Sequence, residues 1–204
     1  MVERQLRHRD IADERVLEAM ARVPWELFVP RSEQRRAYAD AALPIGHGQT
    51  ISQPYMVAVI CQAAEVREGD SILDIGTGSG YQAAVLAELG ANVHTIERIP
   101  ELAERARARL VGAGYENVDV HVGDGSLGVP EHAPYDAVVV TCAPNHVPRA
   151  LVEQTRNGGR IVIPVGPAGA HELYVLEKEH GQLKQRTVLP VRFVPMTGEA
   201  NRPR

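Results

Sequence analysis

The sequence contains only two cysteines, Cys61 and Cys142, in 204 residues. They lie far apart in apolar surroundings, and their spacing matches neither a disulfide framework nor a metal site. Structural disulfides are typical of oxidising compartments. The shortage of cysteine therefore predicts a reduced, cytoplasmic protein.

Long apolar runs and a basic excess are also lacking. No stretch approaches the ~20 apolar residues that span a bilayer, and residues 1–10 are too polar for the apolar region of a signal peptide. Lys and Arg number 22 against 26 Asp and Glu, a formal charge of −4. Because a basic field dominates non-specific binding of nucleic acid, we expect neither a membrane nor a nucleic acid as partner.

The overall amino-acid composition is typical of a globular protein. Hydrophobic residues make up 44% and charged residues 24%, values near the average for folded domains. A chain of this length buries a substantial core, and it carries no internal repeat, low-complexity tract or interdomain linker. We expect one domain and a monomer.

The first quarter is predicted to be helical. Asp10 is expected to cap a helix with apolar positions such as Val16 and Met20, which ends before Pro24. Trp25 and Phe28 follow and are expected to pack this region onto the domain. A second helix is predicted over 55–66.

From residue 71 onward, short β-branched runs alternate with helical ones. Strands are predicted at 71–75, 92–97, 117–122, 136–141 and 160–165, helices at 79–89, 100–111 and 148–155, and a turn at 157–159. This alternation predicts a parallel sheet with helices on both faces. Residues 172–194, with a turn at His180-Gly181, are typical of an antiparallel hairpin.

The predicted fold class is therefore α/β: a doubly wound, mostly parallel, Rossmann-like sheet with an N-terminal helical cap and a C-terminal antiparallel hairpin. The single domain, 1–204, is expected to divide into an N-terminal helical and loop region (1–70), a ligand-binding core (71–166) and a hairpin with tail (167–204).

The segment from Asp74 to Gly80 is a glycine-rich loop between a predicted strand and a predicted helix. Doubly wound folds bind nucleotide-like ligands there, and glycine lets the backbone approach a ligand closely. Tyr81 occupies the last position of the dinucleotide fingerprint, which counts against NAD or FAD, and no Gly-Lys-Ser/Thr occurs, which excludes a P-loop. Taken alone, the loop could also be a plain tight turn.

Carboxylates end the two strands that follow. Glu97, 23 residues after Asp74, can accept hydrogen bonds from both hydroxyls of a ribose. Asp124 can reach an adenine amine, and Asp74 can accept from an ammonium group. These carboxylates suggest a ligand that contains an adenosine and an ammonium group but no phosphate. S-adenosylmethionine has all of these features.

These residues resemble the class I S-adenosylmethionine-dependent methyltransferases. The segment Leu43-Pro-Ile-Gly-His-Gly-Gln-Thr-Ile-Ser-Gln-Pro-Tyr-Met56 narrows the match, because it looks like the signature of the bacterial protein-L-isoaspartate O-methyltransferases. Segments 122–126, 135–141, 158–166 and 191–198 are similar to the same family. The resemblance covers nearly the whole chain, with a departure at 142–145, where relatives usually carry an alanine- and proline-rich run.

The resemblance implies a repair reaction, in which S-adenosylmethionine methylates the free α-carboxylate of an L-isoaspartyl residue and leaves S-adenosylhomocysteine. Its substrates would be isoaspartyl peptides and damaged or flexible protein segments. It implies an active-site role for Ser52. Cofactor contacts are implied for Asp74, Gly76, Thr77, Gly78, Ser79, Gly80, Glu97, Arg98, Asp124 and Gly125, and substrate contacts for Thr50, Ile51, Val194, Pro195 and Thr197.

Ser52 also has a plain structural interpretation, because a serine before Gln-Pro at a helix start is an ordinary N-cap. Both roles can hold at once. A peptide carboxylate, with a reference pKa near ~4, is already ionised at neutral pH, so the reaction needs no general base. This agrees with the lack of an obvious catalytic His or Cys pair.

Other functions stay open from the sequence. His47, His94, His121 and His146 are expected to be scattered over loops and strand ends, so no metal site is predicted. A methyltransferase for nucleic acid or a small molecule is one alternative, although residues 141–144 lack the Asn/Asp-Pro-Pro-Tyr/Phe pattern of amino methylation. A catalytically silent module that senses the cofactor is another, and the presence of Ser52, Glu97 and Asp124 argues against it.

Overall fold

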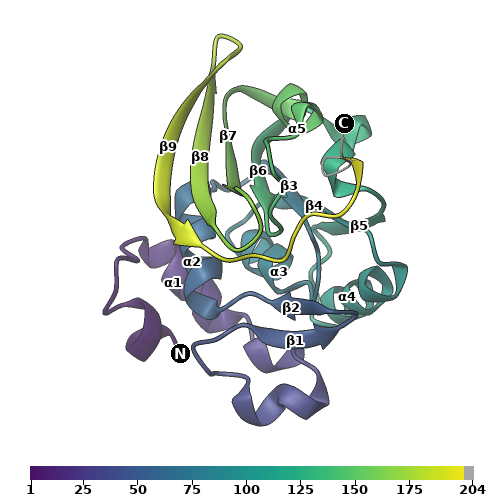
Figure 1. Cartoon of the computed structure of the whole chain (residues 1–204). Helices are drawn as coiled ribbons and strands as arrows, with labels where there is room; N and C mark the ends of the chain where they lie inside the picture. Colours follow the sequence, from purple (N-terminus) through teal and green to yellow (C-terminus); the bar gives the residue numbers. More distant parts are fainter. Residues whose placement is uncertain (200–204) are drawn as a thin grey trace.

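The computed structural model describes residues 1–199, which form a seven-stranded sheet with helices on both faces and a small hairpin beside it (Figure 1). The strands are β3 (Ser71–Ile75), β4 (Asn92–Glu97), β5 (Val118–Val122), β6 (Tyr135–Val140), β7 (Thr155–Val165), β8 (His171–Glu179) and β9 (Gln182–Val191). Their order is β5-β4-β3-β6-β7-β8-β9. The first five are parallel, while β8 and β9 are antiparallel to their neighbours, which confirms the predicted fold class.

The sheet has a separate apolar core on each face. One core joins β3 to the helices α1 (Glu14–Arg22), α2 (Pro54–Ala64), α3 (Tyr81–Glu88) and α4 (Pro100–Gly112). The other packs the opposite side of the strands against α5 (Arg149–Gln154) and the turns at 125–132. Alternate residues of β3 show the division, because Ile72 belongs to the first core and Leu73 to the second.

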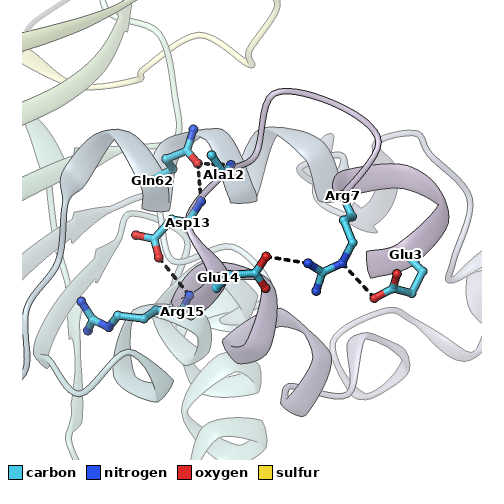
Figure 2. Close-up of polar contacts among 7 residues, drawn as sticks. All are labelled: Glu3, Arg7, Ala12, Asp13, Glu14, Arg15 and Gln62. Atoms are coloured by element: carbon cyan, nitrogen blue, oxygen red, sulfur yellow. Dashed lines mark hydrogen bonds and ion pairs between the residues drawn. The ribbon is translucent and has the colours of Figure 1, made fainter.

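The start of α1 differs from the prediction. Its N-cap is Asp13, whose side chain accepts a hydrogen bond from Arg15 N, and not Asp10. The side-chain oxygen of Gln62 in α2 accepts hydrogen bonds from the backbone N–H groups of Ala12 and Asp13 (Figure 2). These bonds keep the residues before Asp13 out of the helix. Asp10 instead accepts from the hydroxyl of Tyr55 at 2.6 Å.

Further upstream, ion pairs fasten the first turn of the chain to α1. Arg7 contacts Glu3 at 3.1 Å and Glu14 at 2.5 Å, so it joins residues 2–6 to the start of α1 (Figure 2). These groups are exposed, and such pairs contribute little individually to the free energy of folding. The buried side chain of Leu6 fixes the segment more firmly.

The predicted turn at 157–159 is also wrong, because β7 runs without interruption through these residues. Gly158 has a φ of +79°, and the pairing register between β6 and β7 shifts between Tyr135 and Ala137. The glycines therefore form a bulge inside the strand. By contrast, the hairpin turn at His180-Gly181 is confirmed, with φ values of +50° and +80°, as expected for a two-residue hairpin connection.

Trp25 and Phe28 pack the N-terminal region onto the sheet domain, as predicted. Both are fully buried, and their rings lie 4.1 Å and 5.4 Å from the ring of Tyr81, the first residue of α3. Tyr81 directly follows the glycine loop. The N-terminal cap therefore supports the loop through this aromatic cluster. Among residues 1–199, no helix is long and apolar enough to cross a membrane.

Replacing Trp25 with alanine should destabilise the protein by about 3–5 kcal/mol, because the truncation leaves a large cavity between the cap and α3. Urea denaturation followed by circular dichroism measures the change. Leu27→Ala is the matched control, since Leu27 is 52% exposed and its loss should cost less than ~0.5 kcal/mol. Equal effects of the two substitutions would contradict the packing described.

Candidate active site

A cleft lies at the carboxyl ends of β3, β4 and β6, where parallel strands place ligand-binding loops. One wall comes from the small hairpin of β1 (Leu43–Gly46) and β2 (Gln49–Ile51), and another from the C-terminal segment. Of the predicted site residues, the cleft is lined by Thr50, Ile51, Ser52, Gly76, Thr77, Gly78, Ser79, Glu97, Arg98, Gly125, Val194, Pro195 and Thr197.

The floor of the cleft is the glycine loop between β3 and α3. Gly76 and Gly78 have φ values of +96° and +54°, a left-handed conformation that side-chain-bearing residues rarely adopt. A Cβ on Gly76 would stand 2.7 Å from Thr141 Oγ1. Thr141 is itself held by the carbonyl oxygens of Ile75 and Gly76, at 3.0 and 2.9 Å. The loop is therefore a backbone surface against which a ligand can lie closely.

Glu97 ends β4 and fixes this loop. Its Oε2 accepts a hydrogen bond from Gly78 N at 2.9 Å, and its Oε1 accepts from Ile99 N at 3.0 Å. The residue is only 7% exposed, and it lines the cleft. Because each carboxylate oxygen has a second lone pair, Glu97 can hold the loop and still accept from ligand hydroxyls.

Asp74 lies behind the loop and does not line the cleft, which differs from the predicted contact with a ligand ammonium group. Its Oδ2 accepts from Thr95 Oγ1 at 2.7 Å, and Thr95 Oγ1 lies 2.7 Å from Thr77 Oγ1. Its Oδ1 is buried and has no hydrogen-bond partner within residues 1–199. The pKa of Asp74 is raised to about 7, chiefly by burial; the Thr95 hydrogen bond opposes the rise, and the nearby charge of Glu97 adds to it.

Asp124 and Gly80 also stand outside the lining of the cleft. Asp124 Oδ1 accepts from the N–H and hydroxyl of Ser126, and its Oδ2 accepts from Glu199 N at 2.9 Å. Burial opposes ionisation of Asp124, but these hydrogen bonds and the charge of Arg98 outweigh it and lower its pKa. Gly80 is the N-cap of α3 and packs towards Leu110 of α4.

Ser52 stands between β2 and α2, and the structure contradicts its interpretation as a helix cap. The N-cap of α2 is Gln53, and no side chain caps the helix. Gln53 is turned towards Asp40, to which it donates at 2.7 Å. Ser52 is half-buried and lines the cleft, and its hydroxyl has no hydrogen-bond partner in the described chain. The hydroxyl is therefore available to a ligand.

The C-terminal wall of the cleft is the segment from Val194 to Thr197. Val194 O accepts from Ala143 N, and Met196 N donates to Ala143 O, both at 2.8 Å. These bonds fasten the segment beside the end of β6, so that residues more than fifty positions apart in sequence share one wall. The family resemblance implies substrate contacts in this segment, but the local sequence does not indicate that the segment lies beside the end of β6.

Neither cysteine is placed as a nucleophile. Cys142 lines the cleft, but burial, together with the carboxylates around it, raises the pKa of its thiol to about 12. Burial likewise raises the pKa of Cys61 to about 12. Both cysteines are free thiols, and at neutral pH they are protonated and unreactive.

Several residues of the cleft were missed from sequence, namely Val57, Ile75, Tyr81, Gln82, Ile96, Ile99, Thr141 and Cys142. Thr141 and Cys142 could have been found, because they directly follow a parallel strand that ends at the same edge. The expectation of scattered histidines is wrong for His94 and His121, which lie near each other and near His132, away from the cleft.

Comparison with known proteins shows one consistent family. Residues 1–201 match the model of the family described as protein-L-isoaspartate(D-aspartate) O-methyltransferase. A protein-L-isoaspartate O-methyltransferase of Methanoculleus marisnigri is 52% identical over 98% of this chain and 90% of its own length. One from Gloeobacter violaceus is 50% identical over 98% of both chains.

Solved structures agree with these matches. A protein-L-isoaspartate O-methyltransferase superposes with a TM-score of 0.86 and 29% identity, over 93% of this chain and 63% of that longer chain. A Plasmodium falciparum protein, suggested to have the same activity and solved with S-adenosyl-L-homocysteine, gives a TM-score of 0.85 over 96% of both chains. At 23% identity, this second likeness shows the fold alone.

The raised pKa of Asp74 predicts a pH dependence of stability. A carboxyl whose folded-state pKa of about 7 exceeds its unfolded value near ~4 stabilises the fold fully below pH ~4, and that contribution is lost as the pH rises to ~7. Asp74→Asn removes the titration. The free energy of unfolding of the wild type should therefore fall relative to that of Asp74→Asn between pH 4 and 7, by up to a few kcal/mol at ~1.4 kcal/mol per pKa unit.

Urea denaturation of both proteins at several pH values measures this difference. A difference that stays constant with pH would show that Asp74 ionises normally in the folded protein.

Proposed function

The chain belongs to the protein-L-isoaspartate(D-aspartate) O-methyltransferase family, and we propose that the cleft described above is where it methylates isoaspartyl residues. The reaction transfers a methyl group from S-adenosylmethionine to the free α-carboxylate of an L-isoaspartyl residue, and it repairs damaged proteins and peptides. The observation that carries the assignment of the site is the available hydroxyl of Ser52, which lines the same cleft as the glycine loop and Glu97.

The residues present fit an adenosyl ligand. The loop from Gly76 to Ser79 is a cradle that a Cβ on Gly76 would fill. Glu97 lines the cleft where ribose hydroxyls can donate to it, beside Arg98 and Gly125. We assign these residues to cofactor binding, and Asp74, Gly80 and Asp124 to holding the surrounding loops in place.

S-adenosylmethionine, when bound, supplies a methyl group on a positively charged sulfur. The protein has no need to activate the nucleophile, because a peptide carboxylate with a reference pKa near ~4 is ionised at neutral pH. Ser52 donates its hydroxyl to one carboxylate oxygen and so directs the other towards the methyl carbon. Orientation of this kind is worth ~7–11 kcal/mol in intramolecular models.

The walls of the cleft support the same role. Thr50 and Ile51 on one side and Val194, Pro195 and Thr197 on the other line the cleft around Ser52, and we assign them to substrate binding. Because the opposite charges of carboxylate and sulfonium cancel during transfer, a site that excludes water favours the reaction. An isoaspartyl linkage adds a backbone carbon, so the segments that enter are flexible or already damaged.

The methyl ester is an activated intermediate. Attack by the next backbone nitrogen expels methanol and forms a succinimide, which opens in water partly to normal aspartate. This is general ester chemistry, and no residue of the chain is required for it. The protein therefore contributes the methylation alone.

Compartment, assembly and domain division belong to the same proposal. We propose a cytoplasmic monomer that binds no nucleic acid, supported by two free cysteines and an acidic balance of charge. We keep the division into 1–70, 71–166 and 167–204, because each of these regions contributes residues to the lining of the cleft.

A paired-peptide assay tests the function. Labelled S-adenosylmethionine should give a base-labile methyl ester on an isoaspartyl peptide and none on the same peptide with normal aspartate. Label on both peptides would indicate a different specificity. Cofactor binding without any methyl transfer would show a silent binding module.

Ser52→Ala should lower methyl transfer about 10- to 100-fold, because a hydrogen bond to a charged group contributes ~1.5–3 kcal/mol. Ser52 caps no helix, so the thermal midpoint should stay within a few degrees. Ser32→Ala, at an exposed position, is the control and should retain full activity. Near-native turnover of Ser52→Ala would remove Ser52 from the catalytic role.

Gly76→Ala should weaken binding of S-adenosylhomocysteine at least about tenfold, because the new methyl group displaces Thr141 and the loop. Isothermal titration calorimetry measures the dissociation constant. Gly69→Ala is the matched control, since Gly69 has a φ of +84° but open space around it. Both variants incur left-handed strain, so a shared loss of affinity would argue against the cradle.

A further inference from the structure

Three histidines meet on one face of the sheet, at the edge away from the hairpin. His94 lies on β4 and His121 on β5, and the register pairs His94 with Asp119 and Ile96 with His121. Because residues two apart on a strand share a face, both imidazoles point to the same side as Ile96. His132 ends the turn Pro130–His132, which packs against that side.

The three imidazoles are arranged as ligands to one ion. Each offers a ring nitrogen, and the three nitrogens lie within 4.8 Å of one another. His94 Nδ1 stands 3.3 Å from His121 Nε2. Two ligands in a tetrahedral zinc site with bonds of ~2.0–2.1 Å are themselves about 3.3–3.4 Å apart, so this pair already has the required spacing.

Two of the three histidines are partly enclosed by the fold, because His94 and His121 are half-buried. Coordination requires a neutral imidazole, the form that predominates at pH 7 for a histidine with the ordinary pKa of ~6.5. His132 is exposed and stacks on His94, with ring centroids 4.0 Å apart, so it is the ring that can turn to complete the set.

We propose that His94, His121 and His132 bind one divalent transition-metal ion of the zinc class. Neutral imidazoles suit zinc, copper and nickel rather than magnesium or calcium. Asp119, with Oδ2 3.7 Å from His94 Nδ1, is placed to orient the ligands or to share the fourth position with water. None of the three histidines lines the catalytic cleft, so the ion is structural and independent of the proposed methylation.

The ion would join the strands β4 and β5 to the turn at 130–132. An ion that binds only the folded state stabilises it in proportion to its affinity. The turn at 130–132 precedes β6 by only a few residues, and Tyr135 of β6 contacts His94 edge-on at 6.0 Å. Occupancy of the site should therefore be visible as a rise in thermal stability without a change in methyl transfer.

The plain alternative is a hydrogen bond between two neutral imidazoles. It accounts for the 3.3 Å separation of His94 and His121, but it assigns no role to His132. Removal of His132 therefore distinguishes the two explanations, and the exposed position of this side chain makes its loss tolerable to the fold.

The test uses the full chain without a histidine tag, treated with chelator and titrated with zinc chloride. Calorimetry should give about one ion per chain with a dissociation constant on the order of 1 µM or below, and zinc should raise the thermal midpoint. The cobalt-loaded protein should show the visible absorption of a tetrahedral site. His132→Ala should lose all three signals.

His180→Asn is the matched control, because it removes an exposed histidine from the hairpin turn, where asparagine tolerates the left-handed φ of +50°. It should bind zinc as the wild type does. Absence of saturable binding, or binding that persists in His132→Ala, would overturn the proposal. Methyl transfer measured with and without zinc reports on the catalytic cleft separately.

Discussion

The structure of the cleft depends on one carboxylate that is held by two backbone N–H groups. Glu97 accepts from Gly78 of the loop after β3 and from Ile99 at the start of α4, so it joins two neighbouring β-α connections at the carboxyl edge of the sheet. The left-handed glycines place the loop N–H groups where Glu97 can reach them. Backbone hydrogen bonds from Gly76 and Thr77 to the carbonyl oxygen of Ile96 hold the first part of the same loop against β4, and Glu97 fixes the part that follows.

The remaining parts of the cleft are arranged around that junction. Tyr81 begins α3 directly after the loop and is packed by Trp25 and Phe28 from the N-terminal cap. Ala143, on the far side, holds the C-terminal segment through two backbone hydrogen bonds. Segments from the beginning, middle and end of the chain therefore depend on one another for their positions.

Much of this arrangement follows from local sequence. The predictions that were wrong share one cause, which is contact with residues far away in the chain. Strand positions, the His180-Gly181 turn and the packing of Trp25 were predicted because periodicity, backbone preference and size specify them. Asp13 replaced Asp10 as cap because Gln62, far away in sequence, holds the segment before α1. Likewise the glycines at 158 and 159 became a bulge because pairing with β6 overruled a local turn.

The site residues show the same limit. That Glu97 and Ser52 belong to the cleft was predicted from motif and position, whereas the engagement of Asp124 by Glu199 depends on the path of the tail. The three histidines are separated by 27 and 11 positions, and only strand register and the turn before β6 bring them together. Residues brought together only by strand register and a turn have no characteristic spacing in the sequence, so a single sequence does not reveal that they meet.

Asp74 has a thermodynamic consequence for a ligand that carries positive charge. With a pKa of about 7, its carboxyl is close to half protonated at neutrality, and it is buried behind the glycine loop of the cleft. A cation that settles in the cleft favours the ionised form and expels part of that proton. The heat of binding then varies with the ionisation enthalpy of the buffer, and the protein exchanges hydrogen ions with solvent each time the cofactor enters and the uncharged product leaves.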